Sequence, residues 1–207
     1  MKGTIICSTV ALVLPALAQA EPMAYSLDTS HSRVFFTVSH QGYTMMRGMF
    51  REFDGALMYD EDDLSASSVS MTIDAASIDM FHDGLNNHLR NDDFFGVETH
   101  PTLTFESTSV EDLGDSQLRI DGNLTILGQT HPVSLDAVHH QTGQVRGGNV
   151  KVGFSATGSL DRTAYGMNFG TPVLGSEVSF DIQIEATRPG EGGGAPAGMG
   201  MGMGMGQ

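Results

Sequence analysis

Strict alternation of apolar and polar residues is the feature that most constrains the fold of this chain. Its cleanest example is the segment 178–187, whose apolar positions are Val178, Phe180, Ile182, Ile184 and Ala186. A period of two predicts a β-strand with one buried face and one solvated face. Turn-forming residues separate seven similar segments, which lie around residues 34–38, 50–59, 69–73, 103–105, 118–126, 133–137 and 150–156.

The chain is therefore predicted to be all-β, with about eight strands. One segment departs from the pattern: between Phe81 and Arg90, Leu85 and Leu89 lie four residues apart, which favours a short helix between strands. Antiparallel strands with one dry face close either as a sandwich or as a barrel. Periodicity alone leaves both architectures open.

The first twenty residues have the composition of a secretory signal peptide. Lys2 supplies a positive charge, Ile5 to Leu14 form an apolar run, and Ala18-Gln19-Ala20 is a small-residue cleavage site. We expect cleavage after Ala20 and a periplasmic location. The single cysteine, Cys7, lies in this segment, so a domain spanning residues 21–188 must fold on its hydrophobic core without disulfides.

The opposite end of the chain, residues 189–207, is rich in glycine and methionine. Such a composition buries too little surface to offset the entropy of ordering, so this segment is predicted to be a disordered tail outside the domain. Thioether sulfurs select Cu(I), which makes four of its residues candidate copper ligands: Met199, Met201, Met203 and Met205. A tail without a function is the competing interpretation.

The chain is acidic, with 25 Asp and Glu against 10 Lys and Arg and a formal net charge of −15. This charge repels phosphate backbones and anionic lipid headgroups, which argues against nucleic acid or peripheral membrane binding. No later segment is apolar for long enough to span a bilayer, so stable membrane insertion is not expected either. A homodimer remains possible on these grounds.

The order of the polar motifs resembles the YceI family. The central stretch holds His88-Leu89-Arg90 with Asp93-Phe94-Phe95, then His100-Pro101 with Phe105-Glu106-Ser107-Thr108, then Gly122-Asn123-Leu124-Thr125-Ile126 with Pro132-Val133. Three further similar motifs are Tyr25-Ser26-Leu27-Asp28 with His31-Ser32, Gly48-Met49-Phe50 with Phe53-Asp54-Gly55, and Asp161-Arg162 with Tyr165-Gly166-Met167. The resemblance covers residues 24–188.

This resemblance implies an eight-stranded, antiparallel, lipocalin-like barrel that holds a polyisoprenoid or another long-chain amphiphile in a hydrophobic cavity. Eight strands also suit a barrel with room for one slim ligand. The alternating strands then supply five candidate lining residues: Phe36, Phe50, Phe105, Phe154 and Phe180. Ordinary close packing of the same side chains in a filled core is the alternative.

The motif that follows the expected helix supplies the candidates for the cavity mouth. Leu89, Phe94 and Phe95 are expected to close one mouth, with Arg90 near the polar head of a ligand. Arg162 is the second head-group candidate, because a guanidinium fork suits a pyrophosphate or a quinone carbonyl. Pairing of these arginines with Asp92, Asp93 or Asp161 is the structural alternative.

The sequence favours a binding or carrier protein for an isoprenoid lipid such as a polyprenyl phosphate or a quinone, with no cofactor. Neither a Gly-x-Ser-x-Gly elbow nor a phosphate-binding Gly-x-x-x-x-Gly-Lys motif occurs in the chain. We therefore do not expect an enzyme. Two alternatives remain, a copper-handling protein that uses the methionine tail and an enzyme that modifies its bound lipid.

Overall fold

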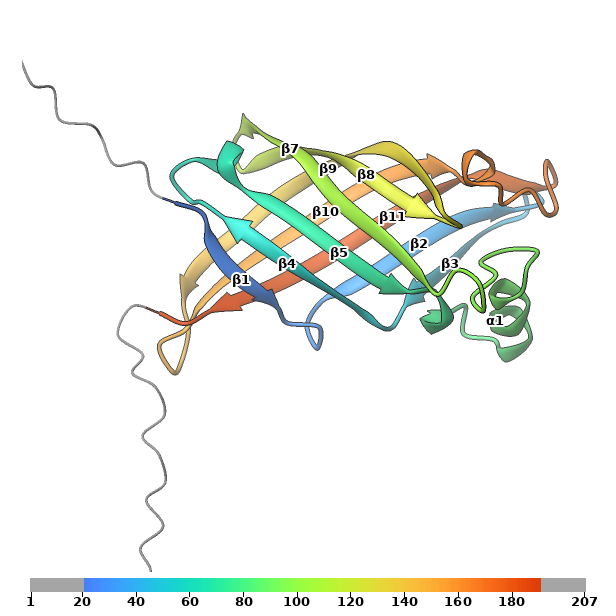
Figure 1. Ribbon diagram of the computed structural model, residues 1–207, viewed down its shortest axis with the longest axis horizontal. Helices are drawn as coiled ribbons and strands as arrows, with labels where there is room; N and C mark the ends of the chain where they lie inside the picture. Colours follow the sequence, from blue (N-terminus) through green and yellow to red (C-terminus); the bar gives the residue numbers. More distant parts are fainter. Residues whose placement is uncertain (1–20, 191–207) are drawn as a thin grey trace, which may run out of the picture.

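The computed structural model describes residues 21–190, in which strands dominate (Figure 1). The strands are β1 (Met23–Leu27), β2 (Arg33–His40), β3 (Thr44–Phe50), β4 (Phe53–Tyr59), β5 (Ser68–Asp74), β6 (Ile78–Asp79), β7 (Thr102–Gly114), β8 (Gln117–Ile126), β9 (Gln129–Gln144), β10 (Val150–Asp161) and β11 (Leu174–Arg188). The helical elements are η1 (Leu64–Ala66), η2 (Ala75–Ser77), α1 (Asp83–Arg90) and η3 (Arg162–Tyr165).

These strands occupy eight positions around a closed antiparallel barrel, which confirms the expected fold class. β1 and β2 share one position because both pair with β11. β3 and β4 share the next position, and β5 and β6 the third, since β1 pairs with β4, β2 with β3, and β3 with β6. Pairing of β1 and β2 with β11 closes the ring.

The strands reach further than the apolar alternation indicates. β7 continues to Gly114 and β9 to Gln144, beyond the segments in which apolar residues alternate cleanly. β1 falls outside all the predicted strands. In these stretches backbone pairing with a neighbouring strand, rather than the side-chain pattern, decides the conformation.

Helix α1 lies between β6 and β7, as the leucine spacing predicts, and Asp79 fastens it to the barrel. The Asp79 carboxylate accepts hydrogen bonds from Asn86 Nδ2 at 3.0 Å and from Arg51 Nε at 2.7 Å. The side chain of Asn86 in turn accepts the backbone N–H of Met80 at 2.7 Å. These bonds favour the carboxylate, so the pKa of Asp79 lies below its ordinary value, with Asn86 the largest cause.

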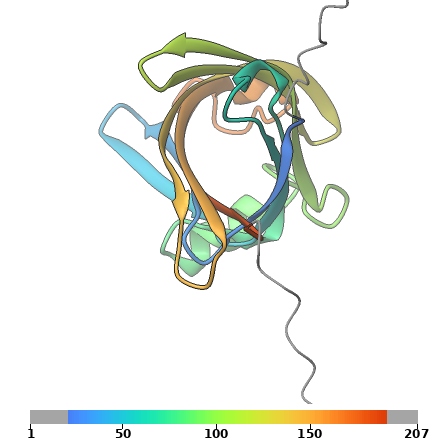
Figure 2. The ribbon, with the colours of Figure 1, turned by 90° about the vertical axis from the view of Figure 1, so that its left-hand side faces the viewer.

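The two ends of the barrel are built from different connections. The first, which we call the α1 end, carries α1, the β2–β3 hairpin and the loop 166–173 (Figure 1). The second, which we call the acidic end, carries the β4–β5 loop, the β7–β8 turn and the β9–β10 loop, and faces the viewer in Figure 2. No helix in residues 21–190 is both long and apolar enough to cross a membrane.

Candidate functional site

The barrel encloses a cavity of about 680 Å³ whose walls come from nearly every strand. Its lining reaches from Phe169 and Val173 at the α1 end to Leu64 and Leu118 at the acidic end. The volume falls within the range of about 300–1,000 Å³ that is usual for sites that bury a small molecule. A cavity with apolar walls between two polar ends fits an extended amphiphilic chain.

Polar side chains among the described lining residues lie near the two ends. At the α1 end they are His40, Gln41, His88, Arg162 and Thr171, and at the acidic end they are Tyr59, Ser67 and Ser68. Between these ends the wall is formed by leucine, isoleucine, valine, methionine, alanine and phenylalanine side chains. Such a surface offers burial and shape to a ligand rather than hydrogen bonds.

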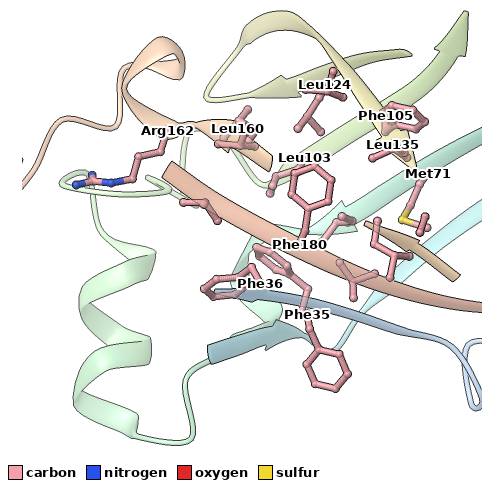
Figure 3. A pocket seen from close by; sticks show the side chains of 18 of the residues that line it. Phe35, Phe36, Met71, Leu103, Phe105, Leu124, Leu135, Leu160, Arg162 and Phe180 are labelled. Atoms are coloured by element: carbon pink, nitrogen blue, oxygen red, sulfur yellow. The ribbon is translucent and has the colours of Figure 1, made fainter. Parts of the chain in front are cut away.

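All the apolar residues predicted to line the cavity lie in its wall: Phe36, Phe50, Leu89, Phe94, Phe95, Phe105, Phe154 and Phe180. Figure 3 shows Phe36 and Phe180 within the apolar cluster, whereas Phe35, the neighbour of Phe36 in β2, points away from it. Phe35 instead packs against the guanidinium carbon of Arg47, which lies 4.2 Å from its ring centre. The alternation along β2 therefore places its aromatic side chains on opposite faces.

Glycines in inward-facing positions leave room beside three of these aromatic rings. Phe180 is the cross-strand partner of Gly158, and a Cβ at that glycine would meet its ring at 2.5 Å. Phe36 lies over its partner Gly48 at the same distance, and Phe105 lies over Gly122. Each ring therefore fills a depression in the wall and leaves the centre of the barrel open.

An aromatic cluster closes the cavity at the acidic end. The ring centre of Tyr59 lies 5.4 Å from that of Phe154, and the ring centre of His139 lies 5.2 Å from Phe154. Leu64 of η1 packs on the same cluster from the β4–β5 loop. Burial raises the pKa of Tyr59 above its ordinary value, as expected for a phenol inside a closed end.

At the α1 end, aromatic residues from separate elements meet around the mouth. The ring of Phe169, from the loop 166–173, lies 5.1 Å from His88 of α1 and 5.2 Å from Phe94. The ring of Phe95 lies 5.7 Å from Phe50 of β3. The structure thus places Phe94 and Phe95, which were predicted with Leu89 to close one mouth, in the cavity wall at the α1 end.

Arg162 is a buried cation beside this mouth, with only 4% of its surface exposed. Its guanidinium donates to four backbone oxygens, those of Met167 at 2.7 Å, Gly175 at 2.8 Å, Phe169 at 2.9 Å and Leu174 at 3.2 Å. Figure 3 shows the side chain extending away from Leu160 and the apolar cluster. Arg162 thus organises the loop that forms one side of the mouth.

The charge of Arg162 is not neutralised by a contacting carboxylate. Among residues 21–190 it forms no ion pair, and desolvation lowers the pKa of its guanidinium. Pairing with Asp161, the structural alternative, does not occur, because that carboxylate accepts from Thr163 instead. The guanidinium therefore places a positive charge beside the mouth, which the carboxylate of Asp161 offsets through space but does not contact.

Comparison with known protein families identifies the family of this chain. A model of the YceI-like domain matches residues 25–186. A UPF0312 protein of Vibrio cholerae serotype O1 is 34% identical over 186 residues, which cover 89% of this chain and 96% of the relative. The chain belongs to the YceI-like family.

Solved structures share the fold of this YceI-like protein. Burkholderia cenocepacia BcnA superposes with a TM-score of 0.70 and 24% identity, over 77% of this chain and 98% of BcnA. A polyisoprenoid binding domain from Saccharophagus degradans gives a TM-score of 0.59 and 17% identity, over 80% of this chain and 98% of that domain. At these identities the comparison concerns architecture, which agrees with the closed barrel seen here.

Arg90, the other predicted head-group residue, lies outside the cavity lining, and this expectation is corrected. Its Nε donates to the carbonyl of Ala76 at 2.7 Å and its Nη2 to the carbonyl of Ile78 at 3.3 Å. The alternative pairing with Asp92 or Asp93 is also absent from the described ion pairs. Arg90 fastens the end of α1 to the segment before it, which a motif shared in sequence does not reveal.

Metal ligation has one geometric candidate in residues 21–190. Asp28, His31 and Glu185 place one potential ligand atom each within 4.8 Å of one another. Lys151 already forms an ion pair with Glu185, and its Nζ lies 3.8 Å from Asp28, so an ammonium group balances this cluster. The proposed copper ligands Met199, Met201, Met203 and Met205 lie outside the described residues.

Sequence reasoning missed the three glycines of the cavity wall and the aromatic cluster at the acidic end. A signal for the glycines exists, because Gly122 and Gly158 take inward positions in otherwise apolar alternations. No local signal brings Tyr59 and His139 together, since they come from β4 and β9. Their proximity depends on the closure of the barrel.

Proposed function

We propose that this protein binds and carries a lipid with a long isoprenoid chain, which lies along the barrel cavity. The observation that supports the proposal most is the continuous apolar lining between the two ends of the barrel. Burial of a methylene contributes about 0.8 kcal/mol. Burial in an apolar cavity of matching shape is therefore enough to bind a long hydrocarbon chain. The polyisoprenoid binding named for the Saccharophagus degradans domain, which has the same fold, agrees with this choice of ligand.

The polar head of the ligand belongs, in this proposal, at the α1 end. Most donors of Arg162 are taken by carbonyls of the loop 166–173 and of the first two residues of β11, so the residue acts on a head group through its charge. A buried charge without a contacting carboxylate favours an anionic head over a neutral one. This supports a polyprenyl phosphate in preference to a quinone.

Binding rather than catalysis is the proposed activity. The wall between the two ends carries no side chain able to act as a nucleophile or a general base, among the described lining residues. The signal-peptide features of residues 1–20 support export and a periplasmic site of action. A carrier there holds its lipid away from water between two membranes or enzymes.

The deciding experiment is organic extraction and mass spectrometry of the protein purified from its native host. We expect one long-chain isoprenoid lipid in about equimolar amount. A variant with Leu124→Glu and Ile182→Glu, which places carboxylates on the apolar wall, is the matched control and should lose the lipid. Repeated recovery of protein without lipid, together with an unchanged melting temperature after addition of isoprenoids, contradicts the proposal.

A further inference from the structure

Large apolar side chains are exposed around the mouth at the α1 end. Tyr43 is 84% exposed and Met45 65% exposed on the β2–β3 hairpin, while Val173 is 60% and Phe169 46% exposed on the loop 166–173. We call these four residues the apolar rim. Isolated exposed apolar residues are ordinary on protein surfaces, but a group of them around one opening calls for an explanation.

The apolar rim is continuous with the cavity. Hairpin and loop are joined by a hydrogen bond from the backbone N–H of Gln41 to the carbonyl of Val173 at 3.0 Å. Phe169 and Val173 belong to the rim and also line the cavity. A ligand that leaves through this mouth therefore passes directly from the apolar wall onto the apolar rim.

The segments that carry the rim lack carboxylates. Residues 38–51 and 162–176 contain no Asp or Glu, although the chain has 25 of them, and they contain Arg47, Arg51 and Arg162. The helix side of the mouth differs, because Asp83 lies on α1 and Asp93 follows it, the latter 3.3 Å from His88. The hairpin and loop are thus the side of the mouth with the fewest carboxylates in its own sequence, although Arg47 pairs with Asp181 of β11 and Arg51 with Asp79 of β6.

Two of the three connections at the acidic end show the opposite composition, whereas the β9–β10 loop contains Arg146 and no carboxylate. The β4–β5 loop contains Asp60, Glu61, Asp62 and Asp63, and the residues around the β7–β8 turn include Glu111, Asp112 and Asp115. Such a surface repels anionic lipid headgroups, as the net charge of the whole chain does. The rim therefore combines four exposed apolar groups with an absence of carboxylates in the two segments that carry them.

We propose that the apolar rim docks on the surface of a lipid bilayer, where the cavity takes up and returns its isoprenoid ligand. The inference rests on the proposed function, because it assumes a ligand that resides in membranes. Tyrosine suits this position, since an aromatic ring with a polar edge favours the boundary between headgroups and acyl chains. Contact at the rim lets the chain move between bilayer and barrel without crossing water.

Few side chains take part, so the docking is reversible. Four apolar residues on one hairpin and one loop do not provide the long apolar face of a stably anchored interfacial helix. The net charge of −15 opposes any wider contact with an anionic surface. The mouth of the protein therefore binds the bilayer transiently, and the protein dissociates with or without a bound lipid.

The test compares a double variant in the rim, Tyr43→Ser with Met45→Gln, with a matched double variant at the acidic end, Leu113→Gln with Val145→Gln. None of these four residues lines the cavity, and all four are exposed. One assay measures flotation with phosphatidylcholine–phosphatidylglycerol vesicles and transfer of polyprenyl phosphate between them. The other assay measures equilibrium binding of a ten-carbon isoprenoid phosphate, which needs no vesicle.

We expect the rim variant to lose flotation and to transfer polyprenyl phosphate at least tenfold more slowly, with its affinity for the soluble phosphate unchanged. The acidic-end variant should behave as the wild type in every assay. Equal transfer rates for rim variant and wild type overturn the docking proposal. So does a wild type that binds the soluble phosphate but never associates with vesicles, a result that points to a donor protein instead.

Failure of the proposed function gives a different result from failure of docking. A wild-type protein that binds neither the soluble phosphate nor the vesicle-borne lipid refutes the carrier function, on which docking rests. The melting temperature of each variant, measured beforehand, separates both outcomes from misfolding.

Discussion

The two ends of the barrel are built from different connections, and their side chains give them different characters. At the acidic end, Tyr59, His139 and Phe154 pack together beneath Leu64, and carboxylates surround them. At the α1 end, comparable aromatic residues surround an opening and some of them face solvent. The comparison shows that strand pairing forms the barrel, whereas the side chains of the connections give each end its own character.

The largest expected difference separates Phe154, in the closed end, from Phe180, in the open middle. Phe154→Ala removes a ring from a packed cluster and should cost about 3–5 kcal/mol of unfolding free energy. Phe180→Ala enlarges a space that already exists, so its cost in the empty protein should be about half of that or less. Denaturant unfolding of the ligand-free variants measures both values.

For ligand affinity we expect the opposite order, with Phe180→Ala having the larger effect. Phe180→Ala should lower the affinity for a long isoprenoid about tenfold or more, because a lost ring contact is worth about 1.5–3 kcal/mol. Equal destabilisation of the two variants with unchanged affinity would mean that the interior is an ordinary filled core.

The next prediction compares the two arginines at the α1 end. Arg162→Ala leaves four carbonyls without their donor and should destabilise the protein by about 3 kcal/mol, since buried acceptors are costly to leave unpaired. Arg90→Ala removes more exposed bonds to Ala76 and Ile78 and should cost about 1 kcal/mol. Thermal and denaturant unfolding provide the comparison.

Binding assays separate the roles of the same two variants. Arg162→Ala should lower the affinity for an isoprenoid phosphate more than the affinity for the corresponding alcohol. Arg90→Ala should lower both affinities slightly and equally. An identical response of phosphate and alcohol to Arg162→Ala would remove the electrostatic argument for an anionic head.

A smaller effect should come from the glycine beneath Phe180. Gly158→Ala pushes the ring toward the centre of the barrel, so we expect about 1–3 kcal/mol of destabilisation and a narrower cavity that binds long chains less tightly. Gly153→Ala on the same strand is the control, because its new methyl meets no atom closer than 3.9 Å. The control should be neutral or stabilising. Unfolding and chain-length titration test the pair.

The smallest effect concerns pH and the attachment of α1. The pKa of Asp79 is below its ordinary value in the folded protein, so its carboxylate stabilises the fold at neutral pH. This contribution should disappear as the pH falls below about 4 toward the lowered folded-state value. Asp79→Asn should reduce stability at pH 7 and flatten its decline in acid, and hydrogen exchange in α1 should become faster.

Asp83→Asn is the control for this pH dependence, because Asp83 lies on the same helix and forms no ion pair within the part of the chain described by the structure. If the stability of Asp79→Asn depends on pH in the same way as that of the wild type, Asp79 does not link the attachment of α1 to pH.

Local patterns in the sequence predicted most of the strands and their inward faces. Alternation identified Phe36, Phe105, Phe154 and Phe180 as inward residues, and all line the cavity. The leucine spacing located α1. These features follow from local geometry, because a strand places every second side chain on one face and a short helix brings residues four apart together.

Family resemblance, rather than periodicity, supported a barrel over a sandwich, because the alternation is the same in both. The closure that decides between them is a pairing of β1 and β2 with β11, at opposite ends of the chain. Pairing over such a separation leaves no mark in any local stretch of sequence.

Only the tertiary structure decided the contacts of the two arginines and the packing at the two ends of the barrel. Arg90 and Arg162 each occur in a motif that resembles the family's, yet Arg162 reaches loop carbonyls beside the mouth and Arg90 holds a helix end outside the cavity. The closing cluster joins Tyr59 to His139, eighty residues apart in numbering, through the barrel ring. The physical reason is that strand periodicity is a local property, whereas the position of a charge or a ring relative to a cavity depends on which distant strands pair.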